Sequence, residues 1–254
     1  MMASFGKMLG ILDLFDTDTP VLSAEEITSR LGCSRPQSYR YIRELCDAGF
    51  LMRFRREYAL GPRCIQLDYT IRQSDPLLKA SMPVMRETSI HNGCDVLLAS
   101  MYQDKIVAVH HERGPDSMTV SFSRGRLMPL FRGAGSKVIL AALPSGLQEE
   151  LYHQHPEDAA LSSLGASWEE VKGNLRSIRR AGYAISVGEL DPVNVGIAVP
   201  LMLEKTMAPS SIVLVLSAVR YRTTDVDAIV RAALLAQERI LSGLTCMAAG
   251  SSTV

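Results

Sequence analysis

The chain of 254 residues lacks the features that would place it in a membrane or outside the cell. It contains no run of 18 or more apolar residues, so no membrane-spanning helix is expected. Its first 20 residues lack a basic segment and a small-residue cleavage site, which argues against a secretory signal peptide. Its five cysteines are scattered and form no C-x-x-C pair. This pattern argues against a disulfide framework or a zinc site and predicts reduced thiols in the cytoplasm.

Common catalytic motifs are missing too. The sequence has no H-E-x-x-H and no G-x-S-x-G, and the glycines around Gly135 break the dinucleotide-binding pattern. His110 and His111 are adjacent on an expected strand, so they point to opposite faces and only one can enter a pocket. We therefore expect no catalytic residues, no metal site and no cofactor, and predict that the protein is not an enzyme. An enzyme acting on a small metabolite through the C-terminal part is the alternative.

Positive charge is concentrated near the N-terminus. The whole chain has 27 basic and 27 acidic residues, but the segment 31–61 holds six arginines against three acids. A neutral protein with a local basic cluster is consistent with binding to a phosphate-lined partner at that segment.

The cluster lies within a predicted winged helix-turn-helix. Residues 5–15 carry an apolar stripe at helical spacing, and a capping box at Ser23 opens a second helix that stops at Gly32. A further capping box at Ser34 opens a third helix, which ends at Gly49. Two strands, 50–54 and 57–60, follow around an Arg55-Arg56 tip and form the wing.

This motif predicts contacts with double-stranded DNA. We expect the third helix to face the major groove and the basic hairpin to contact the DNA backbone or the minor groove. Gln37 can make paired hydrogen bonds to adenine. The candidate DNA-binding residues are Arg35, Gln37, Arg40, Tyr41 and Arg43 on the helix, and Arg53, Arg55 and Arg56 on the hairpin.

The remainder reads as a linker helix, 62–76, followed by an α+β domain. The expected helices are 77–93, 135–143, 167–183 and 225–244, and the expected strands are 94–101, 105–112, 118–122, 183–187, 195–203 and 210–219.

Short motifs in a fixed order carry a resemblance to a known family. They are Tyr39-Arg40, Ala48-Gly49-Phe50-Leu51, Tyr58-x-Leu60-Gly61, Gly125-x-x-x-Pro129, Lys137-x-x-Leu140-Ala141, Arg180-x-Gly182-Tyr183-Ala184, Glu189, Ile197-Ala198-x-Pro200 and Leu216-Ser217. Together they resemble the IclR family of bacterial transcription regulators over nearly the whole chain.

The resemblance implies a winged helix-turn-helix DNA-binding domain (1–61), a linker helix (62–76) and a GAF-like effector-binding domain (77–254) with an antiparallel sheet and flanking helices. It also implies a homodimer or a dimer of dimers that regulates a metabolic operon in response to a small molecule, often an organic or aromatic acid. Two-fold symmetry predicts a pseudo-palindromic operator. A regulator whose second domain only oligomerises, without a ligand, is a further alternative.

The effector site is predicted at a glycine-rich loop, 132–136, that leads into a helix N-terminus. Free N–H groups there favour a carboxylate or phosphate. The candidates from this loop are Arg132, Gly133, Ala134 and Ser136, the last of which could equally be a plain helix cap, and the resemblance adds Glu189 and Ser217. The segments 133–137 and 193–196 depart from the family pattern where its members line the effector pocket, and Pro36-Gln37 departs from it on the third helix.

Overall fold

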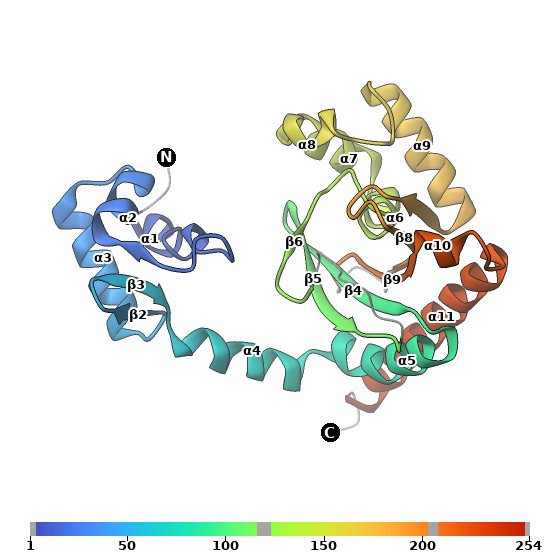
Figure 1. Ribbon diagram of the computed structural model, residues 1–254, viewed down its shortest axis with the longest axis horizontal. Coiled ribbons are helices and arrows are strands. Elements are labelled where there is room, and N and C mark those ends of the chain that lie inside the picture. Colours follow the sequence, from blue (N-terminus) through green and yellow to red (C-terminus); the bar gives the residue numbers. More distant parts are fainter. Residues whose placement is uncertain (1–3, 116–122, 203–207, 252–254) are drawn as a thin grey trace. The chain divides into compact units, whose positions relative to one another are not determined.

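The computed structural model describes residues 4–115, 123–202 and 208–251. The chain divides into two compact units, residues 1–75 and 76–254, which are drawn in Figure 1. Each unit has its own buried core, so each is described by itself.

The N-terminal unit contains the predicted helix-turn-helix and wing. Its elements are α1 (Ser4–Leu9), a 3₁₀ turn η1 (Leu12–Leu14), β1 (Leu22–Ser23), α2 (Ala24–Leu31), α3 (Arg35–Asp47), β2 (Leu51–Phe54), β3 (Glu57–Leu60) and α4 (Pro62–Ser74). The three strands form an antiparallel sheet in the order β1-β3-β2. The pairing of β1 with β3, which the sequence did not predict, links the start of α2 to the wing.

Two local predictions in this unit are wrong. The single helix expected over 5–15 breaks after Leu9, at Gly10, where glycine is a poor helix former, and resumes as a 3₁₀ turn. The capping box at Ser23 is present, with its side chain accepting from the Glu26 N–H. The one expected at Ser34 is absent: the Ser34 side chain makes no cap hydrogen bond, and the Gln37 side chain donates to the Tyr41 hydroxyl oxygen.

The C-terminal unit is a six-stranded antiparallel sheet covered on both faces, which confirms the α+β, GAF-like prediction. Its helices are α5 (Pro76–Asn92), α6 (Ala134–Ala142), α7 (Ser145–Gln154), α8 (Pro156–Ala160), α9 (Trp168–Ala181), α10 (Ala218–Tyr221) and α11 (Val226–Ser251). Its strands are β4 (Asp95–Tyr102), β5 (Lys105–Glu112), β6 (Leu127–Met128), β7 (Ala184–Val187), β8 (Asn194–Leu201) and β9 (Ser210–Ser217), in the sheet order β6-β5-β4-β9-β8-β7.

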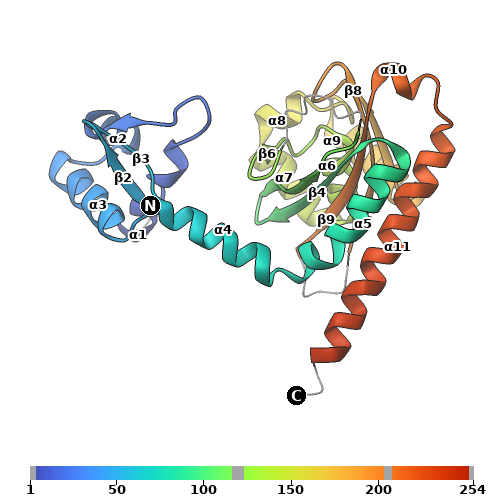
Figure 2. The ribbon, with the colours of Figure 1, turned by 60° about the horizontal axis from the view of Figure 1, so that its bottom comes forward.

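The two faces of the sheet pack against different helices. Figure 2 shows α11 beside α5 on one face, and α6 packs on the other with α9 outside it. Side chains alternate accordingly: Ile197 and Val199 of β8 enter the core under α5 and α11, whereas Ala198 and Val213 pack under α6. The α6 face therefore carries the N-terminus of α6 directly over the central strands.

Short elements account for most of the remaining differences from the prediction. The sequence did not predict α8, α10 or β6, and the strand expected over 118–122 lies outside the described residues. Helix α6 begins one residue earlier than expected, and its N-cap is Gly133, whose φ of 82° suits a glycine. Ser136 therefore lies inside the helix, fully buried, and its alternative interpretation as a helix cap is wrong.

Two arginines bind the carbonyl groups at the ends of helices. Arg220 donates from its two terminal nitrogens to the carbonyl oxygens of Asn92 and Gly93, where α5 ends. Arg179 in α9 donates from its Nε to the carbonyl oxygen of Ala141 and from one terminal nitrogen to that of Leu143, where α6 ends. These carbonyls have no partner within their own helices, so the arginines satisfy them and offset the negative end of each helix dipole.

Removing the Arg220 contact should destabilise the C-terminal unit. We expect Arg220→Ala to lower the free energy of unfolding by about 1–3 kcal/mol, because two carbonyls lose charged hydrogen bonds. Arg220→Lys should recover only part of this, because lysine lacks the planar fork. Urea denaturation measures the loss, and Arg222→Ala, an exposed neighbour, is the control. An equal loss in the control would contradict the assignment.

The described residues contain no helix that is long and apolar enough to cross a membrane. All five cysteines are free thiols. Burial raises the pKa of the Cys94 thiol to about 12, whereas Cys246 is exposed.

The raised pKa of Cys94 predicts an inert thiol in the folded protein. At pH 8 the reactive thiolate should be nearly absent at Cys94, so a disulfide reagent should modify Cys246 at once and Cys94 only after unfolding. The measurement is the amount of thiolate that the disulfide reagent releases from native and from denatured protein. The Cys246→Ser variant shows which part of that amount comes from Cys246. The Cys94 thiol has a lower pKa in the unfolded chain than in the folded protein. The free energy of unfolding should therefore fall as the pH rises from about 9 towards the folded-state pKa of about 12. Fast modification of Cys94 in the native protein would contradict the prediction.

Candidate nucleic-acid interface and ligand cavity

Helix α3 separates its side chains into a buried and an exposed face. Ser38, Tyr41, Ile42 and Leu45 are buried in the core of the N-terminal unit. The exposed face carries Pro36, Tyr39, Arg40 and Arg43. Both sets follow the i, i+3, i+4, i+7 spacing of a helix, so Arg40 and Arg43 point outward as predicted.

The outward placement of Tyr41 is wrong. Its side chain is only 2% exposed, and its hydroxyl oxygen accepts a hydrogen bond of 2.6 Å from the amide nitrogen of Gln37. Tyr41 follows Ser38 by three residues and precedes Leu45 by four, which places it on the buried face. Tyr39 takes the outward position, with 45% of the residue exposed. Its spacing from Pro36 and Arg43 was the signal that could have identified it.

Gln37 is half-buried, and its bond to Tyr41 uses the amide nitrogen. Paired hydrogen bonds to adenine need both the amide nitrogen and the amide oxygen. The amide nitrogen carries two N–H groups, so Gln37 can keep its bond to Tyr41 and still offer one N–H and its oxygen to adenine. The adenine contact stays a prediction.

The helix arginines make only weak surface ion pairs. Arg35 lies 3.7 Å from Glu25, and Arg40 lies 3.9 Å from Glu44 with its guanidinium over the Tyr41 ring. Both pairs are well exposed, and such pairs contribute about 0–1 kcal/mol. A phosphate or a base edge could therefore compete for either arginine at small cost.

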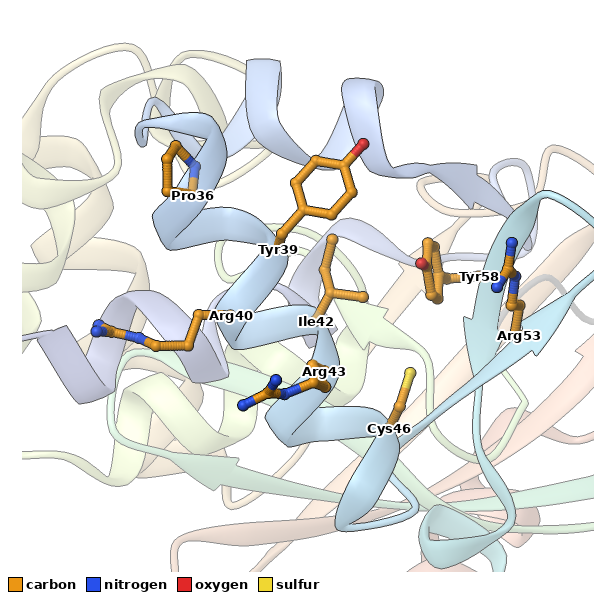
Figure 3. Close-up of a pocket in the computed structure, with 8 residues that line it drawn as sticks. All are labelled: Pro36, Tyr39, Arg40, Ile42, Arg43, Cys46, Arg53 and Tyr58. Atoms are coloured by element: carbon orange, nitrogen blue, oxygen red, sulfur yellow. The ribbon is translucent and has the colours of Figure 1, made fainter.

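An open groove of about 530 Å³ lies between α3 and the wing. Figure 3 shows Arg40 and Arg43 extending from one side of α3, while Arg53 and Tyr58 rise from the hairpin on the other side. Positive side chains therefore border the groove on both sides.

The wing tip adds further exposed charge. Arg55 and Arg56 form the two-residue connection between the paired ends of β2 and β3, and both are exposed. Arg55 has a φ of 60°, a conformation that glycine favours at the first position of such turns. Its backbone oxygen accepts a hydrogen bond of 3.3 Å from the Arg53 side chain. The hairpin thus keeps a charged side chain at a strained position.

In the C-terminal unit, a cavity of about 40 Å³ lies on the α6 face of the sheet. Its apolar floor is formed by Leu97, Val213 and Val215 of the central strands. Ala134 and Gly135 contribute the N-terminus of α6. The remaining wall comes from Ser186, from Asn194 and Gly196 of β8, and from Glu189, Leu190 and Asp191 in the β7–β8 connection.

One carboxylate holds the β7–β8 connection against α6. Glu189 accepts a hydrogen bond of 2.9 Å from the Gly133 N–H and pairs with the ammonium of Lys137. The side chains of Lys137 and Glu189 are 6% and 15% exposed, so the ion pair is largely removed from water. Beside it, the Ala134 N–H donates to the Ser186 hydroxyl oxygen at 3.0 Å.

The structure brings only part of the predicted effector set together. Ala134 and Glu189 line the cavity, and Gly133 adjoins it through its N–H. The other three do not line it: Arg132 has its Nε 4.0 Å from Asp158, Ser136 is buried within α6, and Ser217 caps α10 by accepting from the Arg220 N–H.

Sequence reasoning missed Lys137 and Ser186 as polar groups at this site. Lys137 belongs to a motif that the sequence shares with the family, but a helix motif does not reveal which loop supplies its partner. Asn194 and Gly196 were signalled indirectly, because they lie in the segment that departs from the family pattern.

Comparisons with known proteins agree with this architecture. Residues 70–242 match the family model for the bacterial transcriptional regulator IclR C-terminal domain. The chain is 25% identical over 200 residues to the HTH-type transcriptional regulator KipR of Bacillus subtilis, which covers 77% of this chain and 78% of that protein. It is 24% identical over 197 residues to the HTH-type transcriptional regulator KdgR of Dickeya chrysanthemi, which covers 77% and 64%.

Solved structures share the fold. An IclR transcriptional regulator from Alicyclobacillus acidocaldarius superposes with a TM-score of 0.78 at 20% identity, covering 97% of this chain and 98% of that one. An IclR homolog from Microbacterium hydrocarbonoxydans, complexed with 4-hydroxybenzoate, gives a TM-score of 0.77 at 20% identity, covering 96% and 100%.

These comparisons point to a family of transcriptional regulators. Since the matching family model spans the larger part of the chain, the protein belongs to the IclR family of bacterial transcriptional regulators.

Proposed function

We propose that the protein binds a specific operator through α3 and the wing and responds to a small organic or aromatic acid. In this proposal residues 1–61 bind the DNA and residues 77–254 bind the effector. Residues 62–76 link these two domains. The exposed basic face of α3, with a basic hairpin across the groove, is the observation that carries it. Surface arginines in that arrangement suit a phosphate backbone on either side of a groove.

A homodimer or a dimer of dimers would present two or more such units to the DNA. Two-fold symmetry then requires a pseudo-palindromic operator with half-sites roughly 10 bp, or a multiple of that, apart. Effector binding would regulate the operon by favouring one arrangement of the DNA-binding units over another.

An acid as effector is supported by the donors at the cavity. Lys137 and the N-terminus of α6 provide a buried cation and backbone N–H groups, which suit a carboxylate. The bound 4-hydroxybenzoate in the Microbacterium homolog is an aromatic acid, which supports the same class.

The direct test is binding of the full-length protein to a fluorescent duplex from its own upstream region. Titrations across a salt series, with excess unrelated duplex, separate specific from non-specific binding. Specific binding should survive the competitor and weaken as salt rises, with a slope near −0.9 per neutralised phosphate. Failure to bind any genomic fragment, with or without metabolite mixtures, would contradict the proposal.

Arg40 and Arg43 should contribute to binding in measurable ways. Replacing either with Ala should weaken operator binding, and the salt slope should fall by about 0.9 for each lost phosphate contact. If Arg40 instead contacts a guanine, its loss should cost about 1–3 kcal/mol on the operator and little on unrelated DNA. Arg86→Ala, an exposed arginine on α5, is the matched control. Unchanged binding in both variants would rule out this face of α3.

The two tyrosines of α3 should behave oppositely. Tyr39→Ala should weaken operator binding, because it removes an exposed side chain beside Arg40. Tyr41→Phe should leave operator binding nearly unchanged and lower the free energy of unfolding by about 1 kcal/mol, because the buried bond from Gln37 is lost. Operator titration and thermal denaturation of both variants provide the test. Weaker binding by a stable Tyr41→Phe protein would mean that Gln37 needs this bond to read DNA.

A further inference from the structure

The cavity on the α6 face is too small for an acid effector as it stands. Its volume is about 40 Å³, whereas sites for small-molecule ligands are typically about 300–1,000 Å³. A space of this size holds little more than a water molecule. Ligand entry therefore requires one wall of the cavity to move.

The β7–β8 connection, residues 188–193, is the wall of the cavity that belongs to neither a strand nor a helix among the described residues. Glu189, Leu190 and Asp191 line the cavity from this connection, while the other walls belong to strands or to α6. Leu190 packs against Gly133, where an added Cβ would lie 2.6 Å from its Cδ1 atom. The Glu189 carboxylate ties the connection to α6 through its contacts with Gly133 and Lys137.

Glu189 uses the groups that an acid ligand would need. A ligand carboxylate at this end of the cavity would seek a buried cation and a backbone N–H at the start of α6. Lys137 is the buried cation, and the Gly133 N–H already donates to Glu189. If Glu189 stayed in place, the ligand carboxylate would be repelled at close range by the negative charges of Glu189 and Asp191.

We propose that Glu189 is an internal carboxylate that occupies the acid-binding position, and that an acid effector binds by displacing it and releasing residues 188–193 from α6. This inference rests on the proposed function, because it takes the effector to be an acid. In addition, it makes Glu189 a competitor of the effector. The effector carboxylate replaces that of Glu189 at Lys137, and the β7–β8 connection that closes the cavity then moves.

The proposal is testable without knowing the effector. Glu189→Ala deletes a CH₂–COO⁻ group, which is matched in size and charge by acetate. In sodium acetate at about 200 mM, the variant should melt about 4 °C higher than in sodium chloride at equal ionic strength, and the shift should grow with the logarithm of the acetate concentration. The wild-type protein should show no such difference, because Glu189 already fills the position.

Two further variants locate the effect. Asp191→Ala removes another carboxylate of the same wall, one that accepts a hydrogen bond of 3.3 Å from the amide of Asn194, and it should respond to acetate as the wild type does. Glu189→Ala/Lys137→Met removes the cation and should lose the response. An acetate response that is absent from Glu189→Ala, or equal in the wild type, would overturn the proposal.

If Glu189→Ala does not fold in chloride, refolding replaces melting as the readout. Dilution from urea into acetate should then recover folded protein that chloride does not, and failure in both salts would overturn the proposal. No DNA is involved in these measurements, so their failure would leave operator binding standing. Failed operator binding would likewise leave the acetate result intact.

Discussion

A lysine ammonium is costly to bury without a counter-charge, and the C-terminal unit is organised around one such group. Lys137 lies inside because α6 packs closely on a sheet that is covered on both faces. Glu189, 52 residues later, supplies the counter-charge. The pairing draws the β7–β8 connection to the N-terminus of α6 and closes the cavity there. A single buried ion pair thus ties the shape of the ligand site to the packing of the unit.

In the N-terminal unit the charged side chains are exposed rather than buried. Its arginines lie on the surface of α3 and at the tip of the hairpin, where their ion pairs are exposed and weak. Such groups exchange partners at little cost, as binding to a polyanion requires. The buried face of α3, with Tyr41 among its members, meanwhile holds the helix rigidly on its core. Buried charge therefore fixes the β7–β8 connection on α6, while the charge of α3 stays exposed to solvent.

Local signals predicted most of the architecture. Apolar periodicity and glycine stops located the helix-turn-helix, and period-two strands located the sheet. Predictions were wrong where two local signals competed, as at Ser34, where Gln37 bonds to Tyr41 instead of closing a capping box. Short elements such as α8 and β6 were missed because their few residues carry too weak a pattern.

The sequence by itself determined the order of elements, the basic character of the reading helix and the family resemblance, because these depend on residues close together along the chain. Only the tertiary structure decided that Arg132 and Ser217 lie off the cavity and that Lys137 meets Glu189. Those outcomes depend on contacts between segments far apart in sequence, and on which face of each element the core covers. Burial and pairing of this kind have no signature within a single stretch of the chain.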